Sequence, residues 1–236
     1  MSGINEDFFS VRVIDHIPIK LNLDELLERY NVETPKRNEL ASLVKKYQRI
    51  IEAKAVYTFV KVKSVKNDEV ELYNRDVFKG IILADMLEPE HPLFLFVVTA
   101  GQKVDEQITE DAKGSAFQSV YSAKIGNYAV NKASSYLRSL AEKKLGKTVS
   151  HFGPGTGGGK LFGIEQQKVL FKILDPQKNI GVKLMSNYIM VPMRSISGIY
   201  AVSRYLYIAC QYCPREVCEG RTTSYIGEYH SLRMSS

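Results

Sequence analysis

The chain has 236 residues, of which 44% are hydrophobic and 25% charged, and its 32 Lys and Arg against 26 Asp and Glu leave a net charge of +6. These proportions are typical of a folded globular protein and exclude intrinsic disorder and collagen-like repeats. No apolar run approaches the roughly 18–20 residues of a membrane helix. The acidic start, MSGINEDFF, lacks the basic residues of a signal peptide. We therefore expect a cytoplasmic protein, and its dispersed basic residues predict neither a nucleic-acid partner nor a membrane partner.

Residue patterns in the first part of the chain predict short helices and a hairpin. A helix is expected over 23–29, and a second one opens at Thr34-Pro35, with the threonine as N-cap and the proline at the first helical position. Alternating apolar residues predict a strand over 55–63 and a return strand over 69–73. Residues 76–87 have the pattern of a helix.

The remainder of the chain alternates less regularly between the two kinds of element. The apolar run 93–99 predicts a buried strand, and helices are expected from 102 to 112 and from 115 to 145. A helix ending at Asp175-Pro176 follows a glycine-rich loop, and strands are expected over 182–190, 197–202 and 205–209. Because strands and helices do not alternate as βαβ units, we expect an α+β fold.

The glycine-rich loop, His151-Phe-Gly-Pro-Gly-Thr-Gly-Gly-Gly-Lys160, is the least ordinary segment. Five glycines in ten residues indicate a loop whose backbone can approach a ligand closely. A phosphate-binding P-loop is disfavoured, because Pro154 replaces its first glycine and Leu161 its Ser or Thr. A dinucleotide fingerprint, G-x-G-x-x-G from Gly153 to Gly158, is present, but a helix rather than a strand is expected before it.

Three segments after the loop extend the comparison: Glu165-Gln-Gln-Lys-Val-Leu-Phe-Lys-Ile-Leu-Asp175, Ile180-Gly-Val-Lys-Leu-Met-Ser-Asn-Tyr-Ile-Met-Val-Pro192 and Ser195-Ile-Ser-Gly-Ile-Tyr200. Together with the loop, they resemble the activation (reactivation) domain of cobalamin-dependent methionine synthase in its free-standing form. The resemblance is close over 152–200 and weaker back to about residue 55. A loop that only turns the chain is the alternative.

This resemblance implies an α+β fold with a bent, antiparallel β-sheet flanked by helices. It also implies a division of the chain into an N-terminal helical segment (1–54), an activation-like domain (55–209) and a cysteine-containing appendage (210–236).

The same resemblance implies an accessory protein in reductive methylation. Such a protein binds S-adenosylmethionine (AdoMet) and presents its methyl group to oxidised cobalamin carried by a separate methionine synthase or methyltransferase chain. An electron donor such as flavodoxin or ferredoxin reduces the cobalt, and methylation then traps the reduced cofactor. The accessory protein mainly positions two cofactors, so it forms only part of a catalytic site.

The resemblance places AdoMet contacts in the loop and at the end of a later strand. The implied residues are His151, Phe152, Gly153, Pro154, Gly155, Thr156, Tyr200 and Ala201. The family has an arginine that grips the methionyl carboxylate at the position of His151, and a tyrosine at that of Thr156. A protonated histidine can pair with a carboxylate without the two-point fork of arginine, or Lys160 or Arg194 can supply the charge. Core packing is the alternative role for Tyr200.

Three cysteines lie near the C-terminus in the pattern Cys210-x2-Cys213-x4-Cys218. This spacing is compatible with zinc, for which His230 is the nearby fourth ligand, or with a three-cysteine iron–sulfur cluster. Three reduced thiols are the alternative. The departures at the loop also leave open a second function, a corrinoid-protein docking or metal-binding module that no longer binds AdoMet.

Overall fold

The computed structural model describes residues 8–157, 159–218 and 220–231. Gly158 of the G-x-G-x-x-G pattern and the first seven residues of the acidic N-terminus lie outside the described residues. The strands are β1 (Arg12–Ile14), β2 (Lys54–Lys66), β3 (Glu69–Leu72), β4 (Val77–Lys79), β5 (Pro92–Thr99), β6 (Ser150–Phe152), β7 (Lys183–Leu184), β8 (Met190–Val191) and β9 (Ser195–Ala201). The helices are α1 (Leu23–Arg29), α2 (Arg37–Gln48), α3 (Ile81–Met86), α4 (Gln102–Asp111), α5 (Ala116–Leu145), α6 (Gln167–Leu174) and α7 (Pro176–Ile180).

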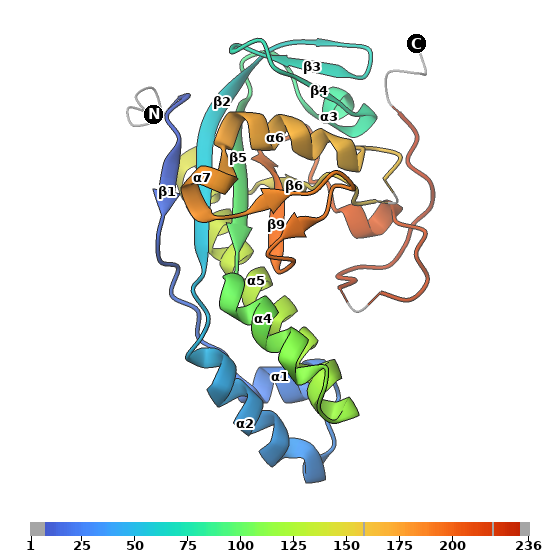
Figure 1. Ribbon diagram of the computed structural model, residues 1–236. Helices are drawn as coiled ribbons and strands as arrows, with labels where there is room; N and C mark the ends of the chain where they lie inside the picture. The colour runs from blue at the N-terminus through green and yellow to red at the C-terminus, as the bar shows by residue number, and fades with distance from the viewer. Residues whose placement is uncertain (1–7, 158, 219, 232–236) are drawn as a thin grey trace.

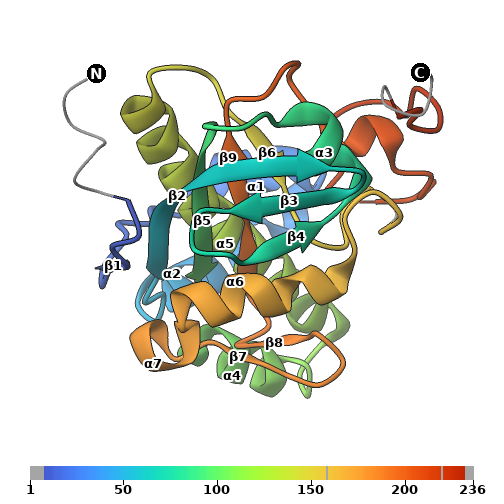
Figure 2. The same cartoon turned by 90° about the horizontal axis from the view of Figure 1, so that it is seen from above.

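The main sheet is antiparallel and strongly bent. Its strand order is β4-β3-β2-β5-β9-β6, and β1 also pairs with β2. The long strand β2 belongs to both halves of the sheet, because residues 54–61 pair with β5 and residues 62–66 with β3. The register shifts between Val62 and Ser64, and there the sheet curls, so that β3 and β4 cross the top of the molecule (Figures 1 and 2). The predicted α+β fold with a bent antiparallel sheet flanked by helices is confirmed.

Apolar side chains fill both faces of this sheet, which explains the uninterrupted apolar run of β5. Phe94 and Phe96 point into a cluster shared with α5, whereas Leu93 and Leu95 point into a second cluster shared with α6. Successive strand residues face opposite sides, so a strand covered on both faces needs apolar residues at every position. Within the described part of the chain, no helix combines the length and apolar character needed to cross a membrane.

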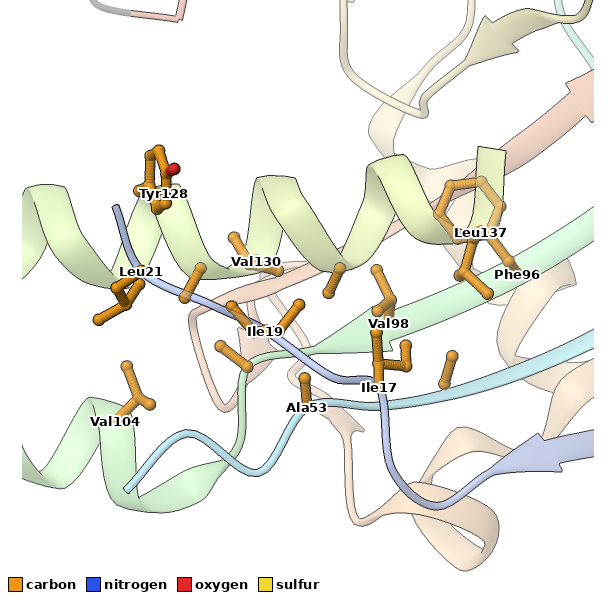
Figure 3. Packing of buried hydrophobic residues seen from close by; sticks show 14 of the residues in the cluster. Ile17, Ile19, Leu21, Ala53, Phe96, Val98, Val104, Tyr128, Val130 and Leu137 are labelled. Carbon is orange, nitrogen blue, oxygen red and sulfur yellow. The ribbon is translucent and has the colours of Figure 1, made fainter. Parts of the chain in front are cut away.

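The N-terminal segment contributes directly to the first of these clusters. Ile17, Ile19 and Leu21 follow β1 in extended conformation and lie in the same core as Val98 of β5 and Leu137 of α5 (Figure 3). Helices α1 and α2 add further buried leucines to it.

Three of the expected elements differ from the structure. The helix expected over 76–87 is a strand, β4, followed by the shorter helix α3, because β4 pairs with β3 and buries Phe78 against Phe162. The strand expected over 182–190 is a small hairpin, β7–β8, which closes on itself through a turn. The strand expected over 205–209 is irregular, because Tyr207 stacks on Phe152 instead of pairing with the sheet.

Two smaller corrections concern where elements begin. Thr34 is not the N-cap of a long helix, since a 3-10 turn, Thr34–Lys36, with Glu33 in the cap position, precedes α2. His151 and Phe152, expected at the start of an irregular loop, belong to the edge strand β6. Tertiary pairing with β9 decides this second case, since three residues carry too little periodicity to predict a strand.

Candidate functional site

Pairing between β6 and β9 brings the two separated groups of predicted site residues together. His151 lies opposite Tyr200, and Ser150 lies opposite Ala201. The glycine-rich loop leaves the sheet directly after Phe152, at the sheet edge formed by β6. Residues some fifty positions apart in the sequence therefore share one corner of the fold.

His151 occupies an aromatic slot. The centroid of its ring is 5.7 Å from that of Phe96 and 5.0 Å from that of Tyr200. The Nε2 atom is shielded from solvent and has no hydrogen-bond partner among the described residues. Burial, and to a lesser degree the nearby Arg138, lowers the pKa of His151 to about 4. The imidazole is therefore neutral at pH 7 and cannot supply the positive charge considered for a protonated histidine.

Tyr200 and Ala201 lie inside the protein. Tyr200 is 2% exposed, and its ring stacks on Phe96 with centroids 4.4 Å apart. Its hydroxyl donates to the Ser134 carbonyl at 3.1 Å and accepts from the Ser134 hydroxyl at 2.8 Å. Burial raises the pKa of Tyr200 to about 12. Ala201 is also fully buried, in the cluster on the opposite face of the sheet.

The start of the glycine-rich loop is a tight, internally bonded turn. Thr156 donates to the carbonyl of Gly153 through both its amide (3.1 Å) and its hydroxyl (2.7 Å), while remaining exposed at the surface. The amide of Gly155 donates to the carbonyl of Phe162 at 2.8 Å. Gly155 has a φ of +82°, a conformation that favours glycine. Two of the loop amides expected to face a ligand thus hold the loop itself, and Pro154 is only half-buried between them.

Two glycines border the shielded nitrogen of His151. A Cβ atom on Gly198 would lie 2.6 Å from Nε2, and one on Gly153 would lie 3.5 Å from it. A side chain at Gly198 is excluded by this approach, since non-bonded heavy atoms pack at about 3.5–4.0 Å. Backbone alone therefore surrounds this nitrogen on two sides.

Two residues, Lys160 and Arg194, are the candidates for the positive charge that His151 does not supply, and they lie in different places. Lys160 is in the loop and exposed. Arg194 immediately precedes β9, at the end of the strand opposite to Tyr200, and β-strand geometry separates the two residues by about 20 Å. Its guanidinium lies 3.9 Å from the carboxylate of Asp105 and packs against Gly126 of α5. Lys160 is thus the cation in the loop, Arg138 is a second cation near His151 and Tyr200, and Arg194 belongs to another part of the molecule.

The hydrogen bonds of Gln167, beside the site, were not predicted from the sequence. Gln167, at the start of α6, accepts from the hydroxyl of Ser197 at 3.2 Å and donates to the carbonyl of Tyr188 at 3.0 Å. It ties α6 to β9 and to the β7–β8 hairpin. The glutamine pair that precedes the apolar face of the helix was the available signal, but polar residues at a helix start usually face solvent.

The three cysteines are half-buried free thiols. Over the described residues, which include these cysteines and His230, no three His, Cys, Asp or Glu side chains gather closely enough to hold a metal ion. The structure gives no support to the zinc or iron–sulfur site that the spacing of Cys210, Cys213 and Cys218 suggested.

Comparison with known proteins finds similarity in both sequence and fold. Residues 154–218 match the family model described as vitamin B12 dependent methionine synthase, activation domain. No match was found among curated protein sequences. Among solved structures, the crystal structure of the MetH reactivation domain bound to AdoHcy has a TM-score of 0.61 and 13% sequence identity, covering 85% of this chain and 81% of that one. The chain therefore has the fold of the methionine synthase reactivation domain, and the family resemblance first indicated by its glycine-rich loop and following segments is confirmed.

Proposed function

We propose that this chain binds AdoMet at the corner formed by β6, β9 and the glycine-rich loop, and serves the reductive methylation of a corrinoid cofactor. The corrinoid would be carried by a separate methionine synthase or methyltransferase chain, with an electron donor such as flavodoxin or ferredoxin. The observation that carries this proposal is the pairing of His151 with Tyr200 ahead of the Phe-Gly-Pro-Gly turn. The bound AdoHcy of the similar MetH domain supports the choice of ligand class.

The residues present can bind a methionyl group, but none of those predicted to contact it in the loop is an arginine that would hold its carboxylate through two hydrogen bonds. The Nε2 atom of neutral His151 has no hydrogen-bond partner among the described residues, and it would bond the polar end of such a group once the Gly153 and Gly198 backbone beside it moves aside. Lys160 can supply the charge that a carboxylate needs. AdoMet, when bound, provides an activated methyl group on its sulfonium. The protein's own contribution is to hold the ligand, and we expect weaker binding than an arginine at position 151 would give.

Calorimetry tests the binding step. We expect AdoMet to bind and AdoHcy to compete with it. Lys160→Ala should weaken binding by about tenfold, the equivalent of one charge-assisted hydrogen bond. Lys147→Ala, which removes an exposed lysine just after α5, is the matched control and should bind like the wild type. Absence of heat at millimolar ligand, together with no competition by AdoHcy, would refute AdoMet binding.

The pKa of His151, lowered by burial, favours a second candidate function, in which the chain docks on a corrinoid protein without binding AdoMet. Mixing the chain with an oxidised corrinoid protein, a reductant and methyl-labelled AdoMet separates the two. Label on cobalt that depends on this chain supports the first function. Co-elution with the corrinoid protein without labelling supports the second.

A further inference from the structure

The C-terminal tail contains a pair of thiols on one turn of 3-10 helix, η3 (Ala209–Tyr212), drawn in red in Figure 1. Cys210 lies within this turn and Cys213 directly follows it. A 3-10 helix has three residues per turn and rises about 2 Å per residue, so these residues lie above one another with Cα atoms about 6 Å apart. That separation falls within the range of about 4.4–6.8 Å that a disulfide spans. Both thiols are free and half-buried.

A single guanidinium holds both ends of this pair. Arg221 donates through Nη1 to the carbonyl of Cys210 at 3.0 Å and through Nη2 to the carbonyl of Cys213 at 3.1 Å. It also donates to the carbonyls of Thr223, at 3.4 Å, and of Arg215. The planar fork fixes the Cys-x-x-Cys backbone and places a permanent positive charge beside it.

The sulfur of Cys210 is surrounded by hydrogen-bond donors. The hydroxyl and amide of Thr222 and the amide of Thr223 face it, and the Arg221 charge lies nearby. Burial opposes ionisation, but these donors and the charge outweigh it, so the pKa of Cys210 lies below its ordinary value. A thiolate is the form of cysteine that attacks electrophiles, and such an environment is typical of reactive cysteines.

The thiol pair also lies close to the glycine-rich loop. The ring of Tyr207 stacks on that of Tyr212, with centroids 5.9 Å apart, and Tyr212 lies in η3 between Cys210 and Cys213. The Tyr207 hydroxyl is 3.0 Å from the position of a Cβ on Gly157. The same ring stacks on Phe152, with centroids 5.3 Å apart. One tyrosine therefore separates the pair from the loop.

We propose that Cys210 and Cys213 form a redox-active thiol pair that closes reversibly into a disulfide. The Cys210 thiolate attacks a peroxide oxygen, the O–O bond breaks, and hydroxide leaves while the sulfur becomes a sulfenic acid. The Cys213 thiol then attacks that sulfur, forms the S–S bond and releases water. The two thiols lose two electrons, and one peroxide is reduced to two molecules of water. This site does not depend on AdoMet binding.

Stoichiometric hydrogen peroxide, added to the reduced full chain and followed by non-reducing peptide mapping, tests the proposal. We expect one intramolecular Cys210–Cys213 disulfide that dithiothreitol reverses, with Cys218 left as a thiol. In Cys213→Ser, dimedone should trap a sulfenic acid at Cys210. In Cys210→Ser, oxidation of Cys213 should be at least about tenfold slower, because the thiolate is lost. Cys218→Ser is the matched control and should form the disulfide at the wild-type rate.

Circular dichroism verifies that each variant is folded. The variant Arg221→Lys is an independent test of the thiol pair. Lysine keeps the charge but cannot hold both carbonyls, so disulfide closure should slow about tenfold or more. The proposal is overturned by Cys218 pairing as readily as Cys213 or by Cys210→Ser oxidising at the wild-type rate. Stoichiometric zinc or iron on the three cysteines of the purified chain would also overturn it.

Discussion

The polar groups at the two ends of β9 are accommodated in different ways. At its start, Arg194 lies beside Asp105, whose carboxylate also accepts the backbone amides of Met193 and Arg194. At its end, Tyr200 packs beside a histidine that burial keeps neutral, and the tyrosine hydroxyl is satisfied by Ser134. One end holds two opposite charges beside each other although both side chains are largely buried, while the other end keeps charge out of an aromatic interior.

This difference bears on where a charged ligand can be held. His151, opposite Tyr200, is neutral, whereas Arg194 lies at the opposite end of β9. A buried ion pair repays the desolvation of its two charges only when its geometry is good and further hydrogen bonds satisfy both partners. Lys160 of the exposed loop and Arg138 of α5, which donates to the Val149 carbonyl at 3.0 Å, are cations near the other end of the strand.

Acidification should have the largest effect, and only at the His151 end. The pKa of His151 is about 4 in the folded chain and 6.5 as a model value, so between these pH values the unfolded chain binds a proton that the folded chain does not. Stability is therefore complete above pH 6.5 and falls as the pH drops toward 4, by at most about 3 kcal/mol. Urea unfolding across this range measures the fall. His151→Phe should flatten it, and an unchanged slope in that variant would contradict the assignment.

Glycine-to-alanine substitutions near the two ends of β9 should differ in how much stability they cost, and this is the next largest effect. Gly198→Ala places a Cβ 2.6 Å from a ring held between two aromatic residues, and should lower the free energy of unfolding by about 2 kcal/mol. In Gly126→Ala, the new Cβ meets the free end of Ile108 at 2.7 Å and Arg194 Cγ at 3.1 Å, and alanine favours the helix. Its cost should be near zero. Equal losses in thermal melts of the two variants would show that the His151 slot is not the tighter site.

Removal of one hydroxyl gives a smaller effect at the same end. Tyr200→Phe keeps the ring stacked on Phe96 but deletes the bonds to Ser134, and should cost about 1 kcal/mol. A double-mutant cycle with Ser134→Ala isolates the pair, because the two losses should not add. Full additivity would mean that the hydroxyl contact contributes nothing.

The smallest effect is expected at the charged end. Asp105→Asn keeps an acceptor for the two backbone amides and removes only the charge facing Arg194 at 3.9 Å. The contact is long and makes no hydrogen bond, and the two side chains are only 15% and 17% exposed, so desolvation largely offsets the attraction and the pair should be worth about 0.5 kcal/mol. Urea unfolding of the variant and the wild type measures this value. A loss above that of Tyr200→Phe would reverse the comparison.

Local signals predicted the larger elements well. Helix α5 follows the predicted bounds 115–145 closely, and the structure closes its ends with a capping box at Ser115 and Gln118 and a left-handed Gly146. The hairpin of β2 and β3 and the buried strand β5 follow from alternation and from a continuous apolar run. Short elements were missed, because β4, β6 and the β7–β8 hairpin contain only two or three residues each and owe their conformation to their pairing partners.

The sequence by itself determined the fold class and the family resemblance, because hydrophobic periodicity, caps and a glycine-rich motif are read from neighbouring residues. Only the tertiary structure decided the protonation of His151, which depends on burial between Phe96 and Tyr200, residues some fifty positions away on either side. It likewise placed Arg194 far from the loop and Cys210 within reach of Arg221. Charge and reactivity depend on which distant residues exclude water from a group, and packing alone sets that.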